Sequence, residues 1–228
     1  MATELTDTKK LWFQKIRKDK KKFIKNQLII DYCRDKKILD VGCVGQDIDY
    51  NNPEWIHSKV KAVSESLTGV DINEDGIVKL NNMGYNIVHY NNLNISNRFD
   101  MILMLDVIEH VDNPVKFIKD YEPFLNDNGK IIITTPNSNR AINFINILFK
   151  NDYSLNYEHT FWFCPKTLME VFNRVDTLKV DSFYWLEDYL PNRNLNWKYR
   201  ILYLLDKILV KLRSNFSHNF MFVLEKKR

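Results

Sequence analysis

The six residues Lys37-Ile-Leu-Asp-Val-Gly42 decide the fold. Three aliphatic side chains in this run predict a short buried strand, and the glycine predicts a turn directly after it. Further apolar runs, separated mostly by helical patterns, lie at 67–72, 86–90, 100–105 and 130–135. This alternation of strands and helices predicts a doubly wound, Rossmann-like α/β sheet whose central strands are parallel.

Two more strands are predicted after the core of this sheet. Residues 178–185 and 220–225 have strand patterning. Because two strands that close an open parallel sheet leave no room for a crossover helix on its usual side, we expect an antiparallel edge pair, which gives seven strands in all. The segment from Trp197 to Arg213 is predicted to be a basic amphipathic helix. Such a helix either packs against the sheet or lies on a membrane surface, and the pattern leaves both interpretations open.

The N-terminal part of the chain is rich in lysine. Residues 9–33 have an intermittent apolar side and predict one basic amphipathic helix. We therefore divide the chain into a basic N-terminal helical extension over 1–35 and a single domain over 36–228. Within that domain, residues 138–175 and 196–213 are predicted to be helical or lid insertions.

The composition restricts the class of protein. The 228 residues are 45% hydrophobic and 27% charged, which is ordinary for a globular protein. The three cysteines show no CxxC spacing, which argues for a reducing compartment and against a zinc site. The sequence shows neither a secretory signal nor a long apolar run. We expect a cytoplasmic protein whose basic helices can touch the inner face of the membrane.

Polar residues and glycines follow three of the predicted strands at the point where each ends. The three segments are Asp40 to Gly45, Val70-Asp71-Ile72 and Leu105-Asp106-Val-Ile-Glu109-His110. The carboxyl ends of parallel strands lie at one edge of a sheet, where ligands bind. Glycines let a ligand approach the backbone, and an acid that ends the second strand can accept hydrogen bonds from ribose hydroxyls. Together these features predict a nucleoside cofactor.

Four ordered motifs carry a more specific resemblance. Ile38-Leu-Asp-Val-Gly-Cys43 resembles the first motif of class I S-adenosylmethionine-dependent methyltransferases. The segments Phe99 to Val111 and Phe124 to Asn137 resemble the fourth-strand and fifth-strand motifs of the same family. Glu158 to Leu168 is similar to a segment that follows the fifth strand in the ubiquinone-type O-methyltransferase subgroup, also described as methyltransferase type 11.

The resemblance implies that S-adenosylmethionine is the cofactor. Its methionine part is expected over the first turn, and its ribose on Asp71. The adenine is expected beside Asn91, with Leu105 and its neighbours against the ring. The cofactor-binding residues that the resemblance implies are Asp40, Gly42, Cys43, Gly45, Asp71, Ile72, Asn91, Asn92, Leu105 and Asp106.

The sequence departs from the family pattern at three positions. Val44 and Gln46 stand where the family prefers glycine, and Asn91 stands where it usually has an acid. These departures keep open a non-catalytic binding protein that retains the fold. A dehydrogenase is disfavoured, because the chain has no GxGxxG turn that opens a helix on a pyrophosphate.

Two histidines are candidate catalytic residues. Methyl transfer to a hydroxyl needs removal of the acceptor proton, and histidine has the best-matched pKa for a general base. His110 follows the fourth strand, and His159 lies in the aromatic segment after the fifth. No metal is assigned; Asp106, Glu109 and His110 leave a Mg²⁺ site as a minor alternative, because they resemble the Glu-x-x-Glu-His set of ubiquinone-type enzymes.

The acceptor is expected to be a small molecule or a glycan. Similar sequences often act on glycans, lipids or quinones, and we favour the hydroxyl of a sugar or lipid-linked glycan. Aromatic side chains that could line its pocket are Tyr153, Tyr157, Phe161, Trp162 and Phe163. An RNA methyltransferase is a weaker alternative and nucleic acid an unlikely partner, since no RNA-binding module is recognised.

Overall fold

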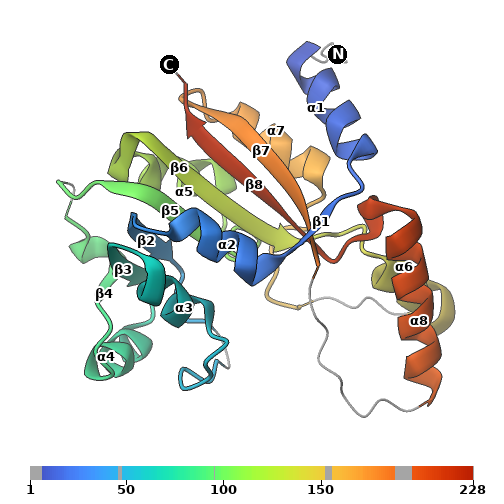
Figure 1. Ribbon diagram of the computed structural model, residues 1–228, viewed down its shortest axis with the longest axis horizontal. Coiled ribbons are helices and arrows are strands. Elements are labelled where there is room, and N and C mark those ends of the chain that lie inside the picture. Colours follow the sequence, from blue (N-terminus) through green and yellow to red (C-terminus); the bar gives the residue numbers. More distant parts are fainter. Residues whose placement is uncertain (1–6, 46–47, 95, 152–155, 188–196, 228) are drawn as a thin grey trace.

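A mixed sheet of eight strands forms the centre of the computed structural model (Figure 1). The structure describes residues 7–45, 48–94, 96–151, 156–187 and 197–227. The strand order is β1-β7-β8-β6-β5-β2-β3-β4. The strands are β1 (Lys22–Ile24), β2 (Lys37–Val41), β3 (Ser66–Asp71), β4 (Ile87–His89), β5 (Phe99–Leu105), β6 (Leu125–Pro136), β7 (Leu178–Glu187) and β8 (Asn219–Lys226). Only β8 runs against its neighbours, so the predicted α/β fold with a largely parallel sheet is confirmed.

Helices cover both faces of the sheet. The α-helices are α1 (Asp7–Lys18), α2 (Lys25–Cys33), α3 (Ile56–Val63), α4 (Glu74–Asn82), α5 (Pro114–Tyr121), α6 (Ala141–Lys150), α7 (Pro165–Asn173) and α8 (Trp197–Leu212). Three short 3₁₀ turns are η1 (Tyr90–Asn92), η2 (Glu122–Phe124) and η3 (Ser214–Phe216). The helices α6 and α8 lie side by side beyond the carboxyl end of β6 (Figure 1).

Apolar side chains that point alternately to the two faces of the sheet form two hydrophobic cores, one on each face. Ile38 belongs to the cluster under α2 and α3, whereas its neighbour Leu39 belongs to the cluster under α1, α5 and α7. Successive side chains of a strand point to opposite faces, so both faces of β2 need apolar residues. This double burial is the reason that the central strands are almost entirely aliphatic.

The prediction of one helix over 9–33 is wrong. α1 ends at Lys18, and after three residues β1 pairs in parallel with β7, with Phe23 opposite Leu186. The run Lys18-Asp-Lys-Lys-Lys22 places like charges side by side and offers no apolar face, whereas Phe23 packs edge-on against Tyr184 with ring centroids 5.0 Å apart.

The predicted number of seven strands is therefore also wrong, because β1 adds an eighth. β1 covers the outer side of β7, so the antiparallel β7–β8 pair does not form the edge of the sheet. The strand predicted at 130–135 is longer in the structure, because β6 begins at Leu125, which pairs with Phe99 of β5.

Candidate active site

The turn after β2 needs glycine at position 42. Gly42 has φ = 73°, a left-handed conformation that disfavours any side chain. A Cβ atom at this position would lie 2.8 Å from Cγ2 of Val107 in the loop after β5. The turn is therefore packed closely against the loop after β5, at the carboxyl edge of the sheet.

Asp71 ties this turn to the end of β3. One carboxylate oxygen accepts the backbone N–H of Val44 at 2.9 Å, and the other accepts those of Ile72 and Asn73 at 2.8 and 3.0 Å. A carboxylate offers about four acceptor positions, so capacity for a further donor remains. The neighbouring Ile72 is 77% exposed, which leaves an apolar side chain beside a polar anchor.

Asp40 does not face the turn. Its carboxylate is buried and lies 2.7 Å from Nδ1 of His57 in α3, and the His57 ring stacks on Trp55 with centroids 5.1 Å apart. His57 was not predicted from the sequence, because a histidine in an amphipathic helix carries no motif. The structure thus gives Asp40 a contact that fixes α3 against β2.

Cys43 and Gly45 complete the turn. Burial raises the pKa of the Cys43 thiol, with Asp40 and Asp71 adding to the effect. A thiol in such surroundings is a packing residue rather than a nucleophile. Gly45 has the side chain of Ile48 against it, 2.1 Å from the position of an added Cβ.

The two asparagines expected near the adenine lie in η1. Asn91 and Asn92 are exposed, and the Asn91 backbone N–H donates to Nδ1 of His89 at 3.2 Å. Leu105 ends β5 and is half-buried, so an apolar surface is available at this strand end.

Asp106 is held in an unusual conformation. Its φ is 52°, and its backbone N–H donates to the carbonyl oxygen of Thr134 at 3.1 Å. One carboxylate oxygen accepts the Thr134 hydroxyl at 2.9 Å, and the other pairs with the ammonium of Lys25 at the start of α2. Lys25 was not predicted from the sequence, because only folding brings the start of α2 to this strand end.

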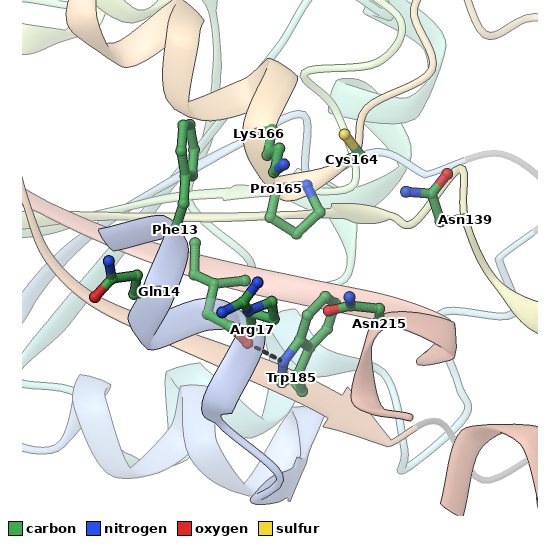
Figure 2. A pocket seen from close by; sticks show the side chains of 10 residues that line it. Phe13, Gln14, Arg17, Asn139, Cys164, Pro165, Lys166, Trp185 and Asn215 are labelled. Atoms are coloured by element: carbon green, nitrogen blue, oxygen red, sulfur yellow. Dashed lines mark hydrogen bonds between the residues drawn. The ribbon is translucent and has the colours of Figure 1, made fainter. Parts of the chain in front are cut away.

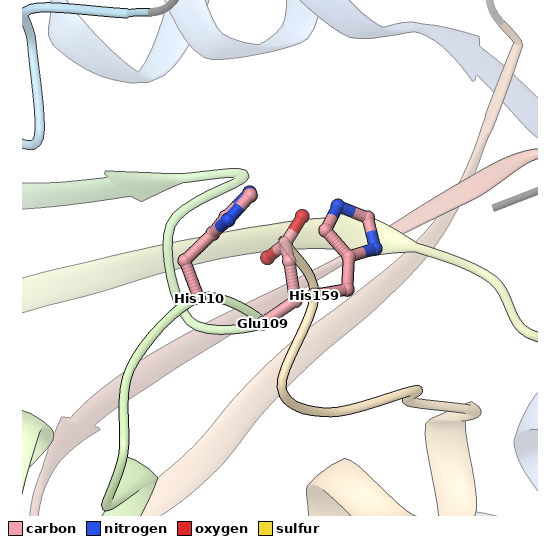
Figure 3. A group of neighbouring side chains, drawn as sticks. All are labelled: Glu109, His110 and His159. Carbon is pink, nitrogen blue, oxygen red and sulfur yellow. The ribbon is translucent and has the colours of Figure 1, made fainter. Parts of the chain in front are cut away.

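Both predicted catalytic histidines lie together beside Glu109 (Figure 3). The rings of His110 and His159 meet edge to face, with centroids 4.6 Å apart. Glu109 is 1% exposed, and its Oε2 accepts the hydroxyl of Thr135 at 3.0 Å. Its other oxygen, Oε1, is buried without a partner among the described residues.

Backbone contacts hold the His159 segment against the loop after β5. The backbone N–H groups of Thr160 and Phe161 both donate to the carbonyl oxygen of Glu109, at 2.9 and 3.1 Å. The Thr160 hydroxyl lies 3.0 Å from the carbonyl oxygens of Glu109 and Val111. Residues about fifty positions apart are therefore fixed relative to each other by hydrogen bonds rather than by side-chain packing alone.

Burial governs the protonation of this cluster. It raises the pKa of Glu109 to about 8, and the nearby Asp106 carboxylate adds to this effect. Burial also lowers the pKa of His159, helped by the neighbouring His110 and Arg140. At neutral pH the histidine is therefore mainly unprotonated and able to accept a proton, while Glu109 is mainly a neutral acid.

The same cluster has the composition of a metal site. Ligand atoms of Glu109, His110 and His159 lie within 4.8 Å of one another. A cavity of about 20 Å³ adjoins Glu109 and His159, which is room for about one water-sized ligand. Asp106, considered with this set from the sequence, instead pairs with Lys25.

A larger cavity also adjoins the segment after β6 (Figure 2). Its volume is about 420 Å³, and Asn139 lines it, whereas Asn137 and Ser138 line the small cavity. Its walls come from α1, the start of α7, β7 and η3. Its lining residues include Phe13, Gln14, Arg17, Lys166, Trp185 and Asn215.

The aromatic residues expected around an acceptor have different environments. Phe161 and Trp162 adjoin the small cavity, but Phe163 is buried in the core and Tyr157 is 100% exposed. Tyr153 lies outside the described residues.

Ubiquinone biosynthesis O-methyltransferases are similar to this chain in sequence. A ubiquinone biosynthesis O-methyltransferase of Dictyostelium discoideum mitochondria is 30% identical over 118 residues, which cover 44% of this chain and 35% of that protein. An enzyme of the same name from Coxiella burnetii is 27% identical over 131 residues, 52% of this chain and 50% of that protein. The chain thus spans half or less of the length of these curated relatives.

Structural and family comparisons cover more of the chain. A crystal structure of an S-adenosylmethionine-dependent methyltransferase from Archaeoglobus fulgidus shares the fold, with a TM-score of 0.51 and 18% identity. The match covers 97% of this chain and 100% of that structure. The profile of a methyltransferase domain family matches residues 10–177, most of the chain and all four motifs, so the chain belongs to this methyltransferase domain family.

Proposed function

We propose that this chain transfers a methyl group from S-adenosylmethionine to a hydroxyl oxygen of a small acceptor, with a sugar or lipid-linked glycan as the favoured class. The observation that carries this proposal is the His110–His159 pair. It lies at the carboxyl edge of the sheet, as do the Gly42 turn and Asp71.

The residues at the ends of β2 and β3 fit the cofactor. The left-handed Gly42 offers backbone without a side chain, the Asp71 carboxylate has acceptor capacity for a ribose, and the exposed Ile72 offers an apolar surface for a flat base. When bound, S-adenosylmethionine supplies a methyl carbon that is already activated. The protein is then left to position the acceptor and take its proton.

The histidine pair supplies the proton acceptor. An imidazole nitrogen of the pair would take the proton that the acceptor hydroxyl loses, with the bound cofactor supplying the methyl group. The lowered pKa of His159 keeps this ring in its basic form at neutral pH. His110, in contact with it, orients the ring or accepts the proton itself.

The 420 Å³ cavity suits the body of such an acceptor. Gln14, Asn139 and Asn215 supply amide groups that pair with hydroxyls, and Phe13 supplies an apolar ring. Arg17 adds a positive charge, which favours an acceptor that carries a phosphate or carboxylate.

The first experiment is calorimetric titration of the full chain with S-adenosylmethionine and S-adenosylhomocysteine, followed by methyl transfer to panels of sugar, phenol and catechol hydroxyls. We expect His159→Ala and His110→Ala to lower turnover by about 10²–10⁴-fold if each takes part in proton transfer, with cofactor affinity unchanged. His159→Gln is the matched variant that keeps hydrogen bonding without a base, and it should be as slow as His159→Ala.

Two results would contradict this function. Unchanged turnover in both histidine variants would remove the pair from the chemistry. Cofactor binding without turnover on any hydroxyl, together with methylation of RNA, would overturn the acceptor class.

A further inference from the structure

The helices α6 and α8 present an unusual amount of apolar surface. Nine of the eighteen large hydrophobic residues that the described structure leaves exposed lie on these two helices. They are Phe144, Ile147, Leu148, Phe149, Ile201, Leu204, Leu205, Ile208 and Leu212. Monomeric soluble proteins rarely expose apolar side chains in such a group unless the surface binds something. We call this surface the α6–α8 face.

The helix α8 buries its acidic residue and exposes part of its apolar residues, while Leu202, Leu209 and Val210 are half-buried. Its single acidic residue, Asp206, is 3% exposed and pairs with His218 at 2.7 Å. Leu204 and Ile208, two residues on either side of Asp206 in sequence, are 58% and 46% exposed. An amphipathic helix that packs on a core does the opposite, with leucine inside and acid outside. Leu204 and Ile208 therefore lie outside the packed side of α8.

Exposed basic residues accompany the apolar side chains on these two helices. The sequences of α6 and α8 contain no acid other than the buried Asp206. Lys150, Arg200, Lys207 and Lys211 are exposed on the two helices, and Arg213 directly follows α8. The long side chains of lysine and arginine can place their charge beside phosphate groups while their methylenes cover apolar surface.

We propose that the α6–α8 face docks onto an anionic membrane surface, with its leucine, isoleucine and phenylalanine side chains at the boundary between headgroups and acyl chains. Charge complementarity selects this occupant. A two-fold dimer through the same face would bring its lysines toward those of the second copy, which opposes association. No helix among the described residues is long and apolar enough to cross a membrane, so the contact is with its surface.

Docking through this face places the candidate active site near the membrane. Arg140 and Asn143, at the start of α6, line the small cavity beside His159. An acceptor that is anchored in the membrane by a lipid could thus present its hydroxyl group to the site. The docking itself does not depend on methyl transfer and is tested without it.

The test is co-sedimentation of the full chain with vesicles of phosphatidylcholine, alone or mixed with anionic phosphatidylglycerol. We expect binding to the mixed vesicles that weakens as salt is added, and much weaker binding to the neutral ones. Lys207→Glu/Lys211→Glu should weaken binding more than about 20-fold, since each lysine near an anionic surface contributes about fivefold. Leu204→Ser/Ile208→Ser should cause a loss of similar size.

Matched controls separate this face from general charge and hydrophobicity. Leu11→Ser/Val78→Ser removes two side chains that are 66% and 60% exposed on α1 and α4, and Lys36→Glu/Lys119→Glu reverses two exposed charges elsewhere. Both control pairs should bind as the original chain does, and circular dichroism checks that each variant folds.

Three outcomes would overturn the proposal. The first is vesicle binding that Leu204→Ser/Ile208→Ser leaves unchanged. The second is binding that does not depend on anionic lipid or on salt. The third is a stable dimer in solution that this same variant dissociates, which would assign the α6–α8 face to a second copy of the chain.

Discussion

Glu109 is a carboxyl group whose environment opposes its charge. One oxygen accepts a hydroxyl from Thr135, the other is buried without a partner, and Asp106 lies close enough to disfavour a second negative charge. These surroundings raise its pKa to about 8 from the 4.5 of an unfolded chain. Its protonation is therefore linked to folding.

Glu109→Gln should remove a pH dependence of stability. Between the unfolded and folded pKa values the native state holds a proton that the unfolded state releases, so the stabilisation is complete below about pH 4.5 and is lost as the pH rises through about 8. Relative to the original chain, the variant should gain roughly a few kcal/mol between pH 5 and pH 9, because glutamine stays neutral.

Urea unfolding across that range, with a chelator present, measures this difference. Parallel stability curves for the two proteins would show that Glu109 does not carry the linkage. A chelator matters, because a divalent ion on Glu109, His110 and His159 would favour the carboxylate.

At the scale of elements, the turn after β2 and the start of α4 are complementary in shape. Val44 stands where the family pattern has glycine, and the opposing position of α4 is Gly76. An added Cβ at Gly76 would lie 2.2 Å from Cγ1 of Val44. The side chain gained by the turn thus occupies the space left by the glycine of the helix.

Gly76→Ala should therefore destabilise the chain by about 1–2 kcal/mol, because overpacking outweighs the gain in helix propensity. It should also weaken S-adenosylmethionine binding, since Val44 shares the Asp71 contact. The double variant Val44→Gly/Gly76→Ala should recover both properties. Thermal unfolding and calorimetry on the four members of this cycle give the coupling, and strictly additive effects would refute the adaptation.

At the scale of the whole molecule, the N-terminal segment is part of the core. Ile29 and Cys33 of α2 are fully buried under the sheet, β1 continues it, and Lys25 reaches Asp106. The free energy of unfolding of the domain therefore depends on residues that precede the first methyltransferase motif at Ile38.

Ile29→Ala should lower the free energy of unfolding by about 2–5 kcal/mol, the usual cost of emptying a buried isoleucine site. Leu11→Ala, at a position on α1 that is 66% exposed, is the matched control and should change it by less than about 0.5 kcal/mol. Urea unfolding distinguishes the two. A small effect of Ile29→Ala would mean that the segment is a separable extension.

The sequence by itself determined the fold class and the order of the chemistry along the chain. Buried strands such as Ile38 to Val41 must be aliphatic on both faces, and Gly42 and Asp71 carry local signals that need no knowledge of distant residues. His110 and His159 were also found this way, because each follows a recognisable strand or motif.

Only the tertiary structure decided which of these groups meet, and what the helices cover. Three contacts join residues that are separated in sequence. They are the ring contact of His110 with His159, the ion pair of Lys25 with Asp106 and the buried pair of Asp206 with His218. The strand Lys22 to Ile24 likewise forms only because the edge of β7 accepts it. These features depend on long-range packing. The periodicity of apolar residues predicts helices and strands, but it does not predict which residues pack against them.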